Sequence, residues 1–262
     1  MGASWPPRLH AWYLAAVSQE LEVLGSLAMP PRFEVLRAAR AIRALMADPD
    51  DLPQVFTIID ALDGTAPHRM YLGFRRSRSG QRLLSERPDI VPALVDRQAL
   101  ARLPEGSLGR AYLAFVEREG ISAEGILGAS LAAVPARRET PGIRYVRCRM
   151  RDTHDLWHAL TGYHGDVVGE LALLAFALAQ HWNTGVALIV AAAIAKGFGR
   201  EELAVVRDGF ARGRRARWLP ALDWESRLAR PLAEVQAELR LEPLSPYREV
   251  RTAELRQEGL VG

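Results

Sequence analysis

RMRDTHDLWHALTGYHGDVVGE, residues 149–170, holds three of the six histidines in this chain of 262 residues. His154 and His158 are four positions apart, so their side chains share one face of a helix. Glycines interrupt the helical pattern further on, and Glu170 follows the last of them. Imidazole and carboxylate groups are typical ligands of a divalent cation. The stretch therefore predicts two helices joined by a glycine-rich turn, with a metal site between them.

The spacing also predicts how Glu170 reaches the histidines. Along one continuous helix, the distance from His158 to Glu170 would be roughly 18 Å, which is too long for shared ligation. A turn at the glycines lets Glu170 begin an antiparallel helix and return beside His158. We expect the first helix to run from about residue 142 to Thr161. Asp155, directly after His154, is a further candidate ligand.

Two arginines precede the histidines on the expected helix. Arg147 and Arg151 lie seven and three positions before His154, so they continue the histidine face. One interpretation is that they bind the carboxylate of a substrate, because a guanidinium pairs with a carboxylate through two parallel hydrogen bonds. The other is that they pair with Asp155 or are simply solvated. The sequence leaves both interpretations open.

The composition limits the classes of function. Hydrophobic residues make up 49% of the chain, charged residues 25%, and the net charge is +3. This mild excess of positive charge does not indicate nucleic-acid binding. The single cysteine, Cys148, excludes an internal disulfide and fits a reducing compartment. We expect no signal peptide and no membrane span, because the most apolar region, residues 171–195, is interrupted by QHWNTG and a span needs about 18 apolar residues.

Helical periodicity dominates the whole chain, which predicts one all-α, multi-helix domain over residues 1–262. N-terminal helices are expected within residues 8–61, including helices near residues 33–47 and 52–61. A motif-bearing core follows at residues 80–240. The arginine-rich segment 64–79 is expected to be a mobile or partner-facing loop.

The motifs resemble one known family. THDLWHALTGYHGDVVGE is similar to the HDxxH-x11-E motif of the fourth coenzyme Q (ubiquinone) biosynthesis protein family, here Coq-four. GQRLLSERP and LPEGSLGRAY, residues 80–88 and 103–112, look like further segments of that family. The tail at residues 213–239 resembles its GRRA…YExRWExxL…EEL ending. The similar segments occur in the same order over most of residues 80–239.

The resemblance implies a metal-binding helical protein with His154, Asp155, His158 and Glu170 as ligands. Zinc is the metal usually described for the family, and two histidines with carboxylates also suit iron or manganese. The implied role is oxidative decarboxylation at C1 of a prenylated quinone-ring precursor, organisation of the biosynthetic complex, or both. The implied partners are that precursor and other ubiquinone biosynthesis proteins, with a homodimer also considered. The implied location is peripheral, on the cytoplasmic side of the membrane, or on the matrix side of the mitochondrial inner membrane in a eukaryote.

Two alternatives remain at this stage. The first is a non-catalytic scaffold that binds a prenylated lipid. The second is a metal-dependent phosphohydrolase of the HD type, in which His68 and Asp208 would have to supply further ligands. The loop residues His164 and Asp166 differ from the family pattern, and their role is left open.

Overall fold

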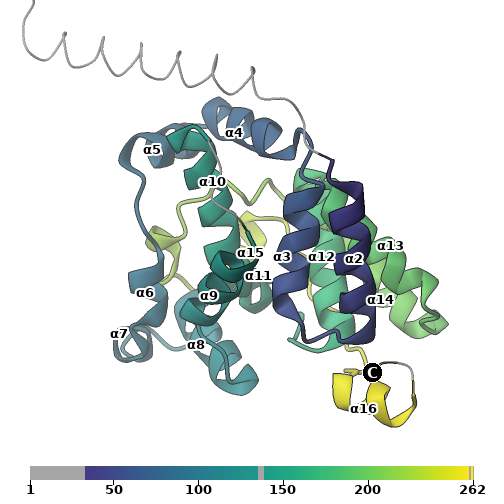
Figure 1. The fold of residues 1–262 in the computed structure, drawn as a ribbon. Coiled ribbons are helices and arrows are strands. Elements are labelled where there is room, and N and C mark those ends of the chain that lie inside the picture. Colours follow the sequence, from purple (N-terminus) through teal and green to yellow (C-terminus); the bar gives the residue numbers. More distant parts are fainter. Residues whose placement is uncertain (1–32, 135–138, 260, 262) are drawn as a thin grey trace, which may run out of the picture.

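The computed structural model describes residues 33–134, 139–259 and 261, and in these ranges it contains helices and no β-strand (Figure 1). The prediction of an all-α fold is confirmed. The part of the expected N-terminal helices that precedes residue 33 lies outside the described residues. In the described part of the chain, no helix is both long and apolar enough to cross a membrane.

The first half of the chain forms short helices. They are α2 (Val35–Ala47), α3 (Leu52–Ala61), α4 (Ala66–Arg76), α5 (Arg78–Glu86), α6 (Val91–Val95), α7 (Arg97–Ala101), α8 (Leu108–Glu119) and α9 (Ala123–Ala133). The second half contains the remaining helices, including the two longest of the described residues. They are α10 (Pro141–Asp152), α11 (His154–Thr161), α12 (Val167–His181), α13 (Thr184–Ala195), α14 (Arg200–Arg215), the 3₁₀ helix η1 (Glu225–Arg227), α15 (Leu232–Glu238) and α16 (Thr252–Gln257).

The prediction of a loop at residues 64–79 is wrong, because α4 and the beginning of α5 occupy the segment. Pro67 in the first turn of α4 suits a helix start. Met70, Tyr71 and Phe74 then recur at helical spacing and are buried in a core cluster with residues of α5 and α10. The arginines of this segment therefore lie on the sides of α4 and α5 that face away from this core cluster, as is typical of amphipathic helices.

Helix α12 is the centre of the fold. Its apolar residues surround the helix, which is typical of a helix that is buried on several sides. Leu173 and Phe176 belong to the largest core cluster, while Leu171 and Ala175 belong to the cluster formed with α2, α3 and α13. Figure 1 shows α2, α3, α12, α13 and α14 side by side on one side of the molecule. Glu170, in the first turn of α12, is thus held by a helix that packs into two core clusters.

Close packing fixes α12 against α14. Gly209 and Gly213, four residues apart on α14, face α12 without a side chain between the two backbones. A Cβ atom on Gly209 would lie 2.3 Å from the carbonyl oxygen of Ala172, and one on Gly213 would lie 2.5 Å from that of Phe176. Both glycines are therefore required by the short distance between the helices.

Helices α10 and α11 correct the expectation of one helix up to Thr161. The helical run is interrupted at Thr153, whose backbone has φ −98° and ψ 2°. The Thr153 hydroxyl donates to the carbonyl of Arg149 at 2.8 Å, a local bond that often bends a helix. The arginines of α10 and the histidines of α11 therefore lie on two helical segments.

Candidate metal centre

The turn between α11 and α12 has the predicted form. Helix α11 ends at Gly162, which adopts the left-handed conformation with φ 84°. Helix α12 begins at Val167, and the side chain of Asp166 accepts hydrogen bonds from the backbone N–H groups of Val168 and Gly169. Such a cap satisfies donors that the first helical turn leaves free. Residues 162–166 thus reverse the chain and return Glu170 to α11.

His154, His158 and Glu170 come together, as the spacing predicts. One ligand atom from each lies within 4.8 Å of the others, the one such group of histidine, cysteine and acidic residues among the described residues. His158 Nε2 is 3.1 Å from Glu170 Oε1, and His154 Nε2 is 3.8 Å from Glu170 Oε2. The two imidazole centres are 4.9 Å apart. The two helices therefore present two nitrogens and a carboxylate to one point.

His158 is held in the form that a metal ligand requires. Its Nδ1 lies 3.0 Å from the carbonyl oxygen of Tyr163, which can only accept, so Nδ1 carries the proton. The other ring nitrogen, Nε2, is buried and faces Oε1 of Glu170 at 3.1 Å. Phe115 stacks on the imidazole at 4.8 Å and fixes the ring plane. An imidazole nitrogen that is held in one orientation beside a carboxylate oxygen fits a divalent cation.

His154 is oriented by its neighbour in sequence. Asp155 Oδ1 is 3.1 Å from His154 Nδ1, which leaves Nε2 facing Glu170. A carboxylate that binds the far nitrogen of a ligating histidine is a common feature of metal sites. Asp155 lies outside the group of three, so its direct ligation stays a prediction, and its observed contact is with His154.

The charges of the cluster influence one another. Burial by itself raises the pKa of Glu170, but the adjacent His158 and His154 outweigh burial and lower that pKa to about 2. Burial by itself lowers the pKa of His154, but the hydrogen bond with Asp155 and the charge of Glu170 raise it overall. The carboxylate of Glu170 is therefore ionised at neutral pH and suited to bind a cation.

Two residues of the cluster, His154 and Glu170, lie in the wall of a large cavity. The cavity has a volume of about 1470 Å³, which exceeds the usual range of small-molecule sites. Its wall combines His154, Asp155 and Glu170 with Cys148 and with many apolar side chains. The apolar ones include Phe56, Leu171, Leu174, Ala177, Val186 and Ile189, so both apolar helices of residues 171–195 contribute.

Arg147 and Arg151 also line the cavity, but neither has the partner suggested by sequence. Arg147 Nη2 is 3.4 Å from Oδ1 of the buried Asp60, and Arg147 also pairs with Glu139. Arg151 Nη2 is 2.6 Å from Asp152 Oδ1. Pairing with Asp155 is thus not observed, and binding of a substrate carboxylate stays a prediction.

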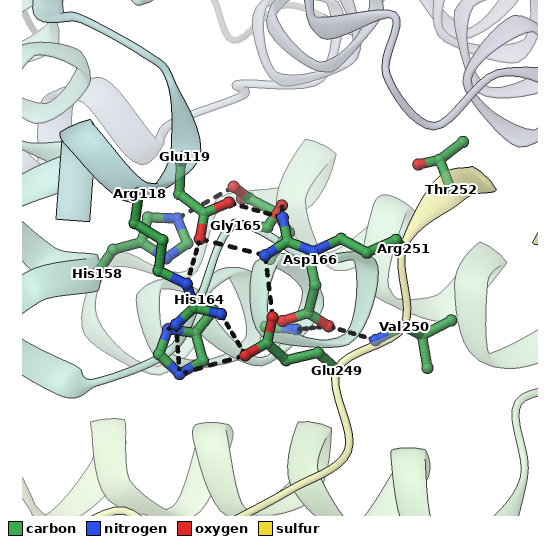
Figure 2. A network of polar contacts seen from close by, with 12 residues as sticks. Arg118, Glu119, His158, His164, Gly165, Asp166, Glu249, Val250, Arg251 and Thr252 are labelled. Carbon is green, nitrogen blue, oxygen red and sulfur yellow. Dashed lines mark hydrogen bonds and ion pairs between the residues drawn. The ribbon is translucent and has the colours of Figure 1, made fainter. Parts of the chain in front are cut away.

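His164 and Asp166 have contacts away from the cluster. His164 Nδ1 lies 2.6 Å from Nη1 of Arg118, and its Nε2 is 3.7 Å from Glu249 (Figure 2). Asp166 is 1% exposed and caps α12. Both residues therefore build the turn between the two helices.

A buried arginine that no sequence motif marks, Arg212, lies against this turn. Arg212 is buried and donates to the carbonyl of Thr161 at 2.9 Å, at the C-terminal end of α11. Its guanidinium lies 5.0 Å from the centre of the Tyr163 ring. Arg212 stands in an arginine-rich stretch, where nothing in the sequence separates a buried arginine from the solvated ones.

The HD-type phosphohydrolase gains no support from this geometry. His68 and Asp208 do not join His154, His158 and Glu170 in the group of potential ligands found among the described residues. Asp208 is instead a half-exposed residue of α14, 4.0 Å from Arg215.

Comparisons with known proteins agree on one family. The family model of the coenzyme Q (ubiquinone) biosynthesis protein Coq4 matches residues 32–245. A mitochondrial ubiquinone biosynthesis protein COQ4 homolog of Anopheles gambiae is 27% identical over 222 residues, covering 81% of this chain and 74% of that protein. The mitochondrial ubiquinone biosynthesis protein coq4 of Talaromyces stipitatus is 34% identical, covering 70% of this chain and 62% of that protein.

A solved structure is similar in fold. It comes from Nostoc punctiforme PCC 73102, from a protein provisionally assigned to ubiquinone biosynthesis. The two structures align with a TM-score of 0.59 and 23% sequence identity, covering 80% of this chain and 99% of the other. The similarity shows that the helices of the two proteins are arranged alike.

Proposed function

This chain belongs to the coenzyme Q (ubiquinone) biosynthesis protein Coq4 family, and we propose that it acts in the oxidative decarboxylation of a prenylated quinone-ring precursor at C1. One observation carries the proposal. His154 and Glu170 of the cluster line a large, mostly apolar cavity, and the buried His158 lies beside them, 3.1 Å from Glu170. A precursor with an apolar tail and a carboxylated ring needs this combination of surfaces.

We assign a divalent cation to the cluster, with His154 Nε2, His158 Nε2 and a Glu170 oxygen as ligands. Zinc is the first candidate, and iron or manganese would suit the same donors. A bound cation supplies a Lewis acid that polarises a carboxylate or ring oxygen. Asp155 and the Tyr163 carbonyl orient the two imidazoles, which favours a fixed geometry over flexible ligation.

The cavity would bind the prenyl tail. Leu171, Leu174 and Ala177 on α12 and Ile189 on α13 offer apolar surface to it. Burial of such a tail stabilises the complex by about 25 cal/mol for each Å² removed from water. The tail would therefore supply affinity, while the polar groups near the cluster would orient the ring.

Arg147 and Arg151 would orient the ring carboxylate. Each guanidinium has five N–H donors, and the observed partners leave donors free for a second carboxylate. Asp60 holds Arg147 in place, so the side chain is partly ordered before the substrate binds. Loss of CO₂ leaves an electron pair at C1, and the guanidinium groups would stabilise that developing charge. O₂ would be the oxidant, with one of its oxygen atoms added at C1 and the other released as water as the ring is oxidised to the quinone.

We place the protein at the membrane surface where the prenylated precursor resides, together with other enzymes of the pathway. Phe33, Val35 and Leu36 support this location, since they are 55%, 63% and 76% exposed at the start of α2. Adjacent exposed apolar residues are typical of an interaction site. Association as a homodimer belongs to the same proposal.

Metal analysis of the purified protein tests the proposal. Wild-type protein should retain about one equivalent of metal, and His154→Ala/His158→Ala should retain none. His68→Ala is the matched control, because it removes an imidazole of α4 that lies outside the cluster and outside the turn, and it should leave the metal content unchanged. Absence of metal in the wild type would contradict the proposed site.

A cellular measurement separates the enzyme from the scaffold. In cells that rely on the Glu170→Ala variant, the prenylated precursor with its C1 carboxylate should accumulate while the other pathway proteins stay assembled. Normal ubiquinone in those cells would refute the catalytic role. Loss of assembly together with loss of ubiquinone would favour the non-catalytic, prenyl-lipid-binding scaffold.

A further inference from the structure

A C-terminal segment, residues 247–252 and here called the strap, lies along the turn that joins the two ligand helices (Figure 2). Val167 N–H donates to the carbonyl of Val250 at 2.9 Å, and Val250 N–H donates to Asp166 Oδ1 at 3.0 Å. The strap begins after residue 245, where the match to the family model ends. Its contacts with the turn are therefore not part of the matched motif.

Tyr247 makes the central contact of the strap. Its hydroxyl donates to Asp166 Oδ2 at 2.7 Å and accepts from the backbone N–H of His164 at 3.0 Å. One hydroxyl thus connects both halves of the turn. Gly169 leaves the space for it, because a Cβ atom there would lie 2.5 Å from the Tyr247 oxygen.

Arg251 attaches the strap to α8. Its guanidinium pairs with Glu119 at 2.6 Å and with Glu249 at 2.9 Å, and its Nη1 lies 3.4 Å from the carbonyl of Gly165. Figure 2 shows these groups as one network that continues to Arg118 and His164. The strap is therefore fixed at a second point, independent of Tyr247.

The strapped turn is bonded directly to two of the three potential ligands. At one end, the Tyr163 carbonyl accepts from His158 Nδ1 at 3.0 Å. At the other end, the Asp166 carbonyl accepts from the backbone N–H of Glu170 at 2.8 Å. A change in the turn would therefore alter the direction of His158 and the position of Glu170 together.

We propose that Tyr247 is a positioning residue of the metal centre, through the hydroxyl that joins Asp166 to His164 across the turn. The inference rests on the proposed function, because it takes the cluster to bind a metal. Partners that orient metal ligands typically change metal affinity by about 10- to 100-fold when they are removed. Tyr247 would act in this way from outside the HDxxH motif.

The test compares Tyr247→Phe with wild type in binding Zn²⁺ and Co²⁺ alone, without substrate. Affinity is measured by competition with a chromophoric chelator, and the visible spectrum of bound Co²⁺ reports the ligand geometry. Tyr247→Phe should bind Zn²⁺ about 10- to 100-fold more weakly and show a changed Co²⁺ spectrum. Tyr145→Phe is the matched control, since it removes a hydroxyl bonded to the Pro88 carbonyl, and it should match wild type.

The outcomes are distinguishable. If wild type binds neither metal, the proposed metal site itself fails. If wild type binds both and Tyr247→Phe has the same affinity and the same spectrum, the inference is overturned while the metal site stands. Circular dichroism of the metal-free variant verifies its fold. Should Tyr247→Phe be unfolded, Arg251→Gln loosens the strap at its other attachment, and an unchanged affinity there overturns the inference.

Discussion

Gly209 allows a sharp test of the packing between α12 and α14. Alanine is the better helix former, so propensity alone predicts that Gly209→Ala stabilises α14 by about 1 kcal/mol. The structure predicts the opposite sign. The new Cβ would lie 2.3 Å from the Ala172 carbonyl oxygen, whereas ordinary contacts begin at 3.4 Å, so the helices must separate by about 1 Å.

The magnitude follows from these two opposing effects. Overpacking of a well-packed core costs about 1–3 kcal/mol, and the upper end applies because the atom that is hit belongs to the backbone. Subtracting the gain in propensity leaves a net destabilisation of about 2 kcal/mol. For a chain of this size, the midpoint of thermal unfolding should then fall by about 4–8 °C.

Gly128→Ala provides the matched control for this prediction. Gly128 also lies inside a helix, α9, but no atom lies within 4 Å of a Cβ built there. The same substitution should therefore raise stability by about 0.5–1 kcal/mol. Urea unfolding followed by circular dichroism compares both variants with wild type. The reasoning is refuted if Gly209→Ala is as stable as wild type or more stable.

Three further predictions address charge and metal. Burial lowers the pKa of His181 to about 4, with Arg69 adding to the effect. Between about pH 6.5 and 4, His181 binds a proton more readily in the unfolded state than in the folded state. The free energy of unfolding therefore decreases as the pH falls, by about 1–2 kcal/mol near pH 5. Melting curves of His181→Gln should show a smaller loss on acidification, and an equal loss would contradict the prediction. Arg149→Met leaves Glu225, now 2.7 Å from the guanidinium, without its partner, and urea unfolding should give a loss of about 3 kcal/mol. Zn²⁺ at about 100 times its Kd should stabilise wild type by about 2.7 kcal/mol and His158→Ala not at all, which calorimetry can measure.

The sequence predicts the local parts of this structure well. Helices α2 and α3 lie within about two residues of the expected segments, since proline and aspartate mark their ends. The approach of Glu170 to His158 follows from helix geometry and the glycine at residue 162. These features depend on residues that are near one another in the chain.

Contacts between distant residues are where sequence reasoning fails. Tyr247 and Asp166 are 81 positions apart, and no spacing rule connects them. Arg147 pairs with Asp60 across 87 positions, a partner that the sequence did not indicate. The interruption at Thr153 depends on one hydrogen bond from its hydroxyl, which competes with the backbone bonds of the helix. The hydrophobic periodicity of the sequence does not predict such a bond.

The position of Cys148 has a practical consequence. The chain has a single thiol, and that thiol lies in the wall of the cavity. An alkylating reagent therefore modifies one defined site in the unaltered protein, without any engineered cysteine. A ligand that fills the cavity should shield the sulfur and slow the modification. The rate of alkylation thus reports occupancy for any lipid offered to the protein, before its chemistry is known.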